Sequence, residues 1–74
     1  MNIEELRKIN RTAPFRPFVI RTADGETVGV PHPDFLMIPA IGETVVAVDQ
    51  EGGFHIIDAS HVTKVEMRKQ ARRK

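Results

Sequence analysis

The sequence predicts a mostly β domain, with an amino-terminal helix followed by a small five-stranded antiparallel barrel or curled sheet. Apolar residues in the first eleven positions recur at helical spacing, whereas beyond Pro17 they alternate along short runs. Turn residues, several of them glycines, separate these runs at the spacing of hairpins. A length of 74 residues fits one domain, close to the lower limit for a single hydrophobic core. We therefore expect one folded domain over residues 1–67.

The predicted helix spans residues 2–11. Asn2 is a suitable N-cap, and the two glutamates that follow it complement the helix dipole. Ile3, Leu6 and Ile9 form one narrow apolar stripe. A helix this short is not stable alone, so we expect it to pack on the strands.

Five strands are expected at about residues 17–22, 26–31, 43–49, 53–58 and 61–67. Asp24-Gly25 predicts a hairpin between the first two, with positive φ at both central positions of its turn. Prolines at 31 and 33 interrupt the ladder, and a short extended stretch follows at 35–38. The third and fourth strands are joined by a turn at 50–53, and the last two by a tight turn at 58–60.

The charge is distributed unevenly along the chain. Residues 1–67 contain six Lys and Arg against ten Asp and Glu, a net charge of −4, whereas residues 68–74 carry +5. The five bases are Arg68, Lys69, Arg72, Arg73 and Lys74. An acidic body with a basic tail differs from a uniformly basic nucleic-acid binder. We expect this tail to be flexible, because it lacks apolar periodicity.

Two local motifs are distinctive: Pro-Phe-Arg-Pro-Phe at residues 14–18 and His-Pro-Asp-Phe at residues 32–35. With the Asp24-Gly25 hairpin and the closing residues 53–63, they make the chain similar to a group of short, uncharacterised bacterial proteins. That resemblance covers most of the chain from Ile3 to Met67. It implies a family but no function.

The order of helix, hairpin, loop, hairpin and tight turn is also similar to the layout of Sm-like and Src-homology-3-type barrels. Sm-like proteins bind RNA, and their last two strands are joined by a segment with a basic residue. Residues 58–61 of this chain, Asp-Ala-Ser-His, contain an acid there instead. An Sm-like nucleic-acid-binding protein that uses its basic tail is therefore the alternative functional prediction.

No catalytic, cofactor or metal site is predicted. His32, Asp34, His55, Asp58 and His61 are all of ligand type, but residues 55 and 58 point to opposite faces of a strand. We expect structural roles for them, with Asp34 capping a local turn. Ser60 is the only serine, and its neighbour His61 diverges from it along a strand, so we expect no enzyme activity.

The leading prediction is a protein–protein interaction module that self-associates or binds another protein. Apolar residues lie on both faces of several strands, more than one helix can cover, which favours a homo-oligomer. The expected interaction surface contains Val45, Ala47 and Ile57, together with Arg16 between its two Pro-Phe pairs. Alternatively, Arg16 pairs with Glu66 or Asp58.

We expect a cytoplasmic protein that does not enter the membrane. The chain has no cysteine, and acids stand near its start where a signal peptide would carry bases. Its longest apolar run is far shorter than the roughly 20 residues that span a bilayer.

Overall fold

The computed structural model describes residues 1–67. One helix precedes six strands and two short 3-10 turns, so the chain is mostly β, as predicted. The elements are α1 (Ile3–Asn10), β1 (Phe18–Thr22), β2 (Thr27–Val30), η1 (Pro33–Phe35), β3 (Leu36–Met37), β4 (Thr44–Val48), β5 (Phe54–Asp58), η2 (Ala59–His61) and β6 (Val62–Met67). The tail that we predicted to be flexible, residues 68–74, lies outside the described residues.

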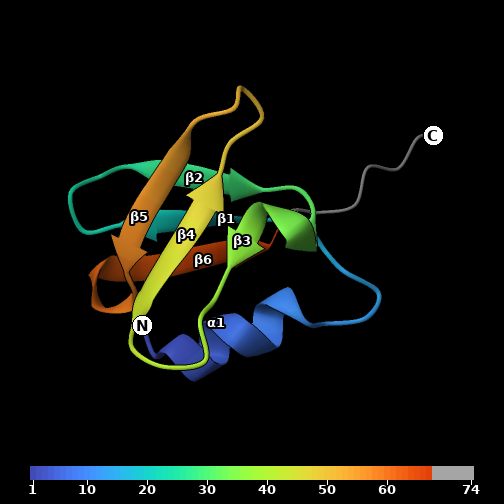
Figure 1. Cartoon of the computed structure of the whole chain (residues 1–74), viewed down its shortest axis with the longest axis horizontal. Coiled ribbons are helices and arrows are strands. Elements are labelled where there is room, and N and C mark those ends of the chain that lie inside the picture. Colours follow the sequence, from blue (N-terminus) through green and yellow to red (C-terminus); the bar gives the residue numbers. More distant parts are fainter. Residues whose placement is uncertain (68–74) are drawn as a thin grey trace.

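Within residues 1–67 the strands form two antiparallel three-stranded sheets, with orders β2-β1-β6 and β3-β4-β5, and not a closed barrel. Figure 1 shows β4 and β5 crossing the first sheet at a steep angle, with α1 along one side. The strands divide into two sheets because residues 31–35 interrupt the chain after β2. Pro31 ends β2, and His32 caps the 3-10 turn η1, which redirects the chain into the short strand β3.

The first hairpin turn differs from the type expected from Asp24-Gly25. Gly25 has a φ of 89°, but Asp24 does not have positive φ. The amide of Gly25 donates to the carbonyl of Thr22 (3.0 Å), and the amide of Thr22 donates to the carbonyl of Glu26 (3.0 Å). This is the pattern of a type I turn followed by one left-handed glycine, which also suits the strand twist.

Regular alternation would place Thr63, Val65 and Met67 on one face of β6, but Thr63 breaks this alternation. Ile20 pairs with Val65, but the register shifts so that Thr22 pairs with Val62. Thr63 is the extra residue of a bulge, and Val62 turns inward and is only 2% exposed.

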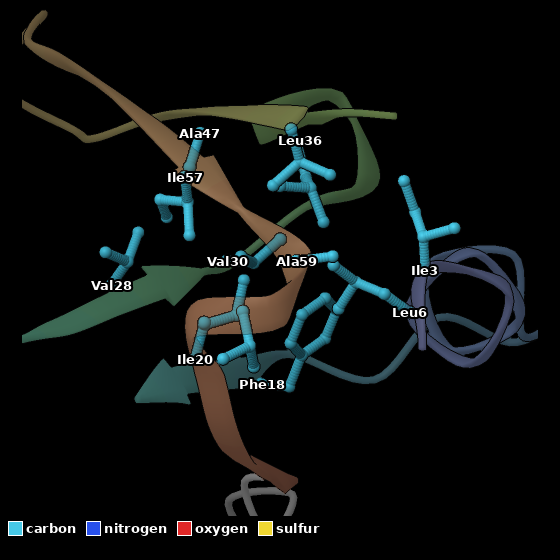
Figure 2. Packing of buried hydrophobic residues seen from close by; sticks show 12 residues of the cluster. Ile3, Leu6, Phe18, Ile20, Val28, Val30, Leu36, Ala47, Ile57 and Ala59 are labelled. Atoms are coloured by element: carbon cyan, nitrogen blue, oxygen red, sulfur yellow. The ribbon is translucent and has the colours of Figure 1, made fainter. Parts of the chain in front are cut away.

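The core lies between the two sheets and is closed on one side by α1 (Figure 2). Ile3 and Leu6 of the helix stripe are buried in it, as their spacing predicted. The nitrogen of Met1 lies 3.2 Å from the carbonyl oxygen of Ala59 and 3.0 Å from that of Val62, which holds the start of the helix against η2. No helix within residues 1–67 has the length and apolar character required to cross a bilayer.

Candidate interaction surfaces

The side of sheet β3-β4-β5 that faces away from the core is apolar. Met37 pairs with Val46, which in turn pairs with Ile56, so these three side chains form one row across the sheet. Val48 and Phe54 form the next row. Phe54 is 65% exposed and Ile56 is 67% exposed. We call the surface formed by these five residues the outer face.

The residues predicted to form the interaction surface lie on the opposite side of these strands. Val45 and Ala47 are completely buried, and Ile57 is 8% exposed. The prediction was therefore wrong about the face: Val45 pairs with Ile57 within the core, and their neighbours Val46 and Ile56 point outward. Alternation correctly indicated two apolar faces but did not reveal which one α1 and the first sheet would cover.

A groove of about 440 Å³ runs along β5, between this strand and the turn of the first hairpin. Val28, Ile56 and Ile57 provide its apolar lining. Asp24, Glu26 and Asp58 line it with carboxylates, and the remaining lining residues are Thr22, Ala23, His55 and His61. We call it the β5 groove. No sequence pattern indicated this groove, because residues 22–28 and 55–61 meet only in the folded chain.

Hydrogen bonds favour the charged form of two of these carboxylates. The hydroxyl of Thr22 donates to Asp24, which lowers the pKa of that carboxyl. The amide of Ser60 donates to Asp58 (2.9 Å), the first cause of the lowered pKa of Asp58, and the Ser60 hydroxyl adds a second bond (2.8 Å). His61 is near enough to both carboxylates to contribute to each shift. The groove is thus acidic at neutral pH.

The five histidines and aspartates considered as ligands do not form one site, because His32 and Asp34 lie at η1 whereas His55, Asp58 and His61 line the β5 groove. The imidazole Nδ1 of His32 accepts from the amide of Asp34 at 3.5 Å, so His32 caps η1 and the expected cap at Asp34 is wrong. Among residues 1–67 no three His, Asp or Glu side chains form a group able to hold a metal ion. Asp58 caps η2, which gives it the structural role we expected.

His55 has a partner that the sequence did not suggest. Its Nε2 lies 3.3 Å from Oδ2 of Asp49. Asp49 Oδ1 also accepts from the amides of Glu51 (2.9 Å) and Gly53 (2.8 Å), and these two bonds are the main causes of its lowered pKa. Asp49 therefore organises the turn between β4 and β5 and places His55 on the groove side of the strand.

Arg16 is exposed, and no carboxylate of residues 1–67 lies within ion-pair distance of it. The predicted partner Glu66 instead binds Arg21 (3.1 Å) and Lys64 (3.1 Å), and the Arg21 contact is the first cause of the lowered pKa of Glu66. The alternative prediction, that Arg16 pairs with Glu66 or Asp58, is thus wrong. Arg21 binds Glu66 because it lies on β1, the strand that pairs with β6. The predicted nucleic-acid contacts, Arg68, Lys69, Arg72, Arg73 and Lys74, lie outside the described residues.

Comparison of the chain with protein-family models, with curated proteins and with solved structures gives no match.

Proposed function

We propose that the chain is a non-enzymatic protein-interaction module that self-associates through the outer face. The supporting observation is the alignment of five apolar side chains on one side of the sheet: Met37, Val46, Val48, Phe54 and Ile56. Isolated exposed apolar residues are common, whereas a contiguous exposed apolar patch is often an interaction site. Exclusion of water from these side chains provides the driving force for association.

A second copy is the partner that fits this face best. Two identical sheets with apolar faces can pack face to face with their strands within about 30° of each other, as in β-sandwiches. A two-fold arrangement brings the same residues of both copies together and places the polar residues Thr44 and Asp58 at the margin. Because only five apolar side chains form the face, we propose reversible, concentration-dependent association rather than a standard stable interface of roughly 800 Å² per partner.

A five-stranded barrel of the Sm-like or Src-homology-3 type is the proposed parent architecture. In support of this architecture, the helix is followed by five longer strands in the order β1, β2, β4, β5 and β6. The short turn η2 joins the last two of them. The interruption at η1 accounts for the additional strand β3.

A non-enzymatic role agrees with how the polar groups of the β5 groove are used. Ser60 Oγ donates to Asp58 Oδ1 and not to an imidazole, which is unlike an activated nucleophile. Asp58 and Asp24 each accept a hydrogen bond within their own turn. A cytoplasmic location, proposed from the lack of cysteine, is compatible with this role.

The proposal is tested by measuring molar mass over a concentration series by light scattering. At about 300 mM salt, we expect the mass of the wild type to rise with concentration and Phe54→Glu to stay monomeric, because a buried charge in the contact is costly. Ile41→Glu is the matched control, since Ile41 is 87% exposed in the loop before β4 and outside the outer face.

Three results would count against self-association by this face. The wild type could remain monomeric at high concentration, or Phe54→Glu could associate as well as Ile41→Glu. A monomer that bound a different protein through Phe54 would replace the second copy with another partner.

A further inference from the structure

The β5 groove follows a strand edge that has no partner among residues 1–67. β5 is the last strand in the order β3-β4-β5 and pairs only with β4. At the ends of this ladder, the amide of Asp49 donates to the carbonyl of Gly53 (2.9 Å), and the amide of Ala59 donates to that of Glu43 (2.7 Å). Alternate residues of a strand direct their backbone groups to the same side. Residues 54, 56 and 58 therefore present theirs to the open edge.

The edge of β5 also lacks the features that usually prevent strand addition. Proteins protect exposed edges with prolines, lysines, bulges or very short strands. Pro31 follows β2, β3 has two residues, and β6 carries a bulge and Lys64. β5 has five residues and no lysine or proline, and its one charged residue is Asp58 at its end. Of the sheet edges in residues 1–67, it is the one best suited to receive another extended segment.

The charge of the groove restricts what that segment can be. Its lining contains Asp24, Glu26 and Asp58 but no lysine or arginine. The chain itself contains a complementary segment, residues 68–74, with five basic residues and no acidic one. In an extended form, Lys69, Ala71 and Arg73 would share one side, so that a small apolar side chain is flanked by two bases. This pattern matches an apolar groove floor with a carboxylate rim.

We propose that the β5 groove binds residues 68–74 of a second copy as an additional strand on β5. Backbone hydrogen bonds to residues 54, 56 and 58 hold the segment, and the carboxylates of the groove select its basic side chains. The contact does not depend on the outer face and goes beyond the self-association proposed above.

The donor is a second copy because of where β6 ends. Met67 pairs with Phe18, at the opposite end of the sheet from the pair of Thr22, which lines the groove, and Val62, which follows the lining residue His61. Along β6 the two ends are five residue steps apart, a distance of roughly 17 Å. If residues 68–72 ran fully extended back along β6, all five would be needed to span this distance. Arg68 and Lys69 of the same chain therefore cannot reach the groove.

The test measures binding of a fluorescent peptide with the sequence of residues 68–74 to the full-length protein by anisotropy at low salt. We expect saturable binding that Glu26→Lys weakens about tenfold, because one attractive pair becomes repulsive. Glu51→Lys makes the same charge change on an exposed turn residue outside the groove, and it should bind like the wild type. A peptide with its five bases replaced by glutamine should not bind.

Equal affinities of Glu26→Lys and Glu51→Lys would overturn the proposal. So would an absence of peptide binding combined with binding of labelled RNA or DNA that needs the five bases, which would assign the segment to nucleic acid. Circular dichroism checks that both variants fold.

Association between copies is tested in the Phe54→Glu background, which removes the outer-face contact. A chain with Glu26→Lys has an intact basic segment, and a chain with glutamine at its five terminal bases has an intact groove. We expect these two chains to bind each other in a pull-down, although neither binds itself. If this mixture failed to bind, while Phe54→Glu alone was monomeric in light scattering at about 300 mM salt, groove binding between copies would be rejected and the outer-face proposal would stand.

Discussion

At the scale of single residues, two aspartates define the ends of β5. Asp49 accepts hydrogen bonds from the amides of Glu51 and Gly53 before the strand, and Asp58 accepts one from Ser60 after it. Short carboxylate side chains suit these positions because they bond to backbone amides two to four residues away. Both interactions favour the ionised carboxyl and lower its pKa. The geometry of the groove strand thus depends on charge in its flanking turns.

Asp49→Asn is expected to reduce stability at neutral pH but not in acid. The ordinary pKa of Asp is 3.8 and that of folded Asp49 is lower, so its ionisation stabilises the fold above this value. This contribution is lost as the pH falls through the pKa of folded Asp49, because the protonated side chain is then neutral, as asparagine is. The urea midpoints of wild type and variant should therefore differ at pH 7 and converge below about pH 4. A difference that stays constant down to pH 2.5 would contradict the role of the charge.

At the scale of elements, each side of β5 lies in a different environment. Ile57 points into the core and is 8% exposed, whereas the adjacent Ile56 is 67% exposed on the outer face. His55, on the inner side, is held by Asp49, and the backbone of residues 54, 56 and 58 faces the open edge. One five-residue strand therefore contributes to the core, the outer face and the β5 groove.

Two neighbouring truncations should separate these roles. Ile57→Ala removes buried methyl groups and should lower the free energy of unfolding by about 2–4 kcal/mol. Ile56→Ala should change it by less than about 0.5 kcal/mol, since the side chain is mostly exposed, yet it should weaken self-association. Urea unfolding at low protein concentration measures the first effect, and light scattering the second. If both variants were equally destabilised, the assignment of inner and outer faces would be wrong.

At the scale of the whole molecule, the sequence predicted the order of the elements better than their arrangement. The stripe of Ile3, Leu6 and Ile9 and the two glycine turns were sufficient for the helix and hairpins, because these signals are local. The burial of Val45 rather than Val46 was not predictable, since both are valines on adjacent positions and only packing against other elements distinguishes them. The β5 groove required knowing that the first hairpin turn approaches β5, a contact between residues about thirty positions apart.

The two proposed contacts respond differently to salt, which allows them to be separated in the intact protein. The groove contact joins basic and acidic groups that are open to solvent, so it should weaken steeply between about 50 mM and 300 mM salt. The outer-face contact is apolar and should persist over this range. We therefore expect the self-association of the wild type to decrease with salt to a plateau, which represents the outer-face contact alone. Glu26→Lys should associate at about this plateau level at every salt concentration. Phe54→Glu should associate at low salt only, and its association should disappear at high salt. Sedimentation velocity at several salt concentrations measures all three proteins. Loss of wild-type association to zero would leave the groove as the only contact, and salt-independent association would leave only the outer face.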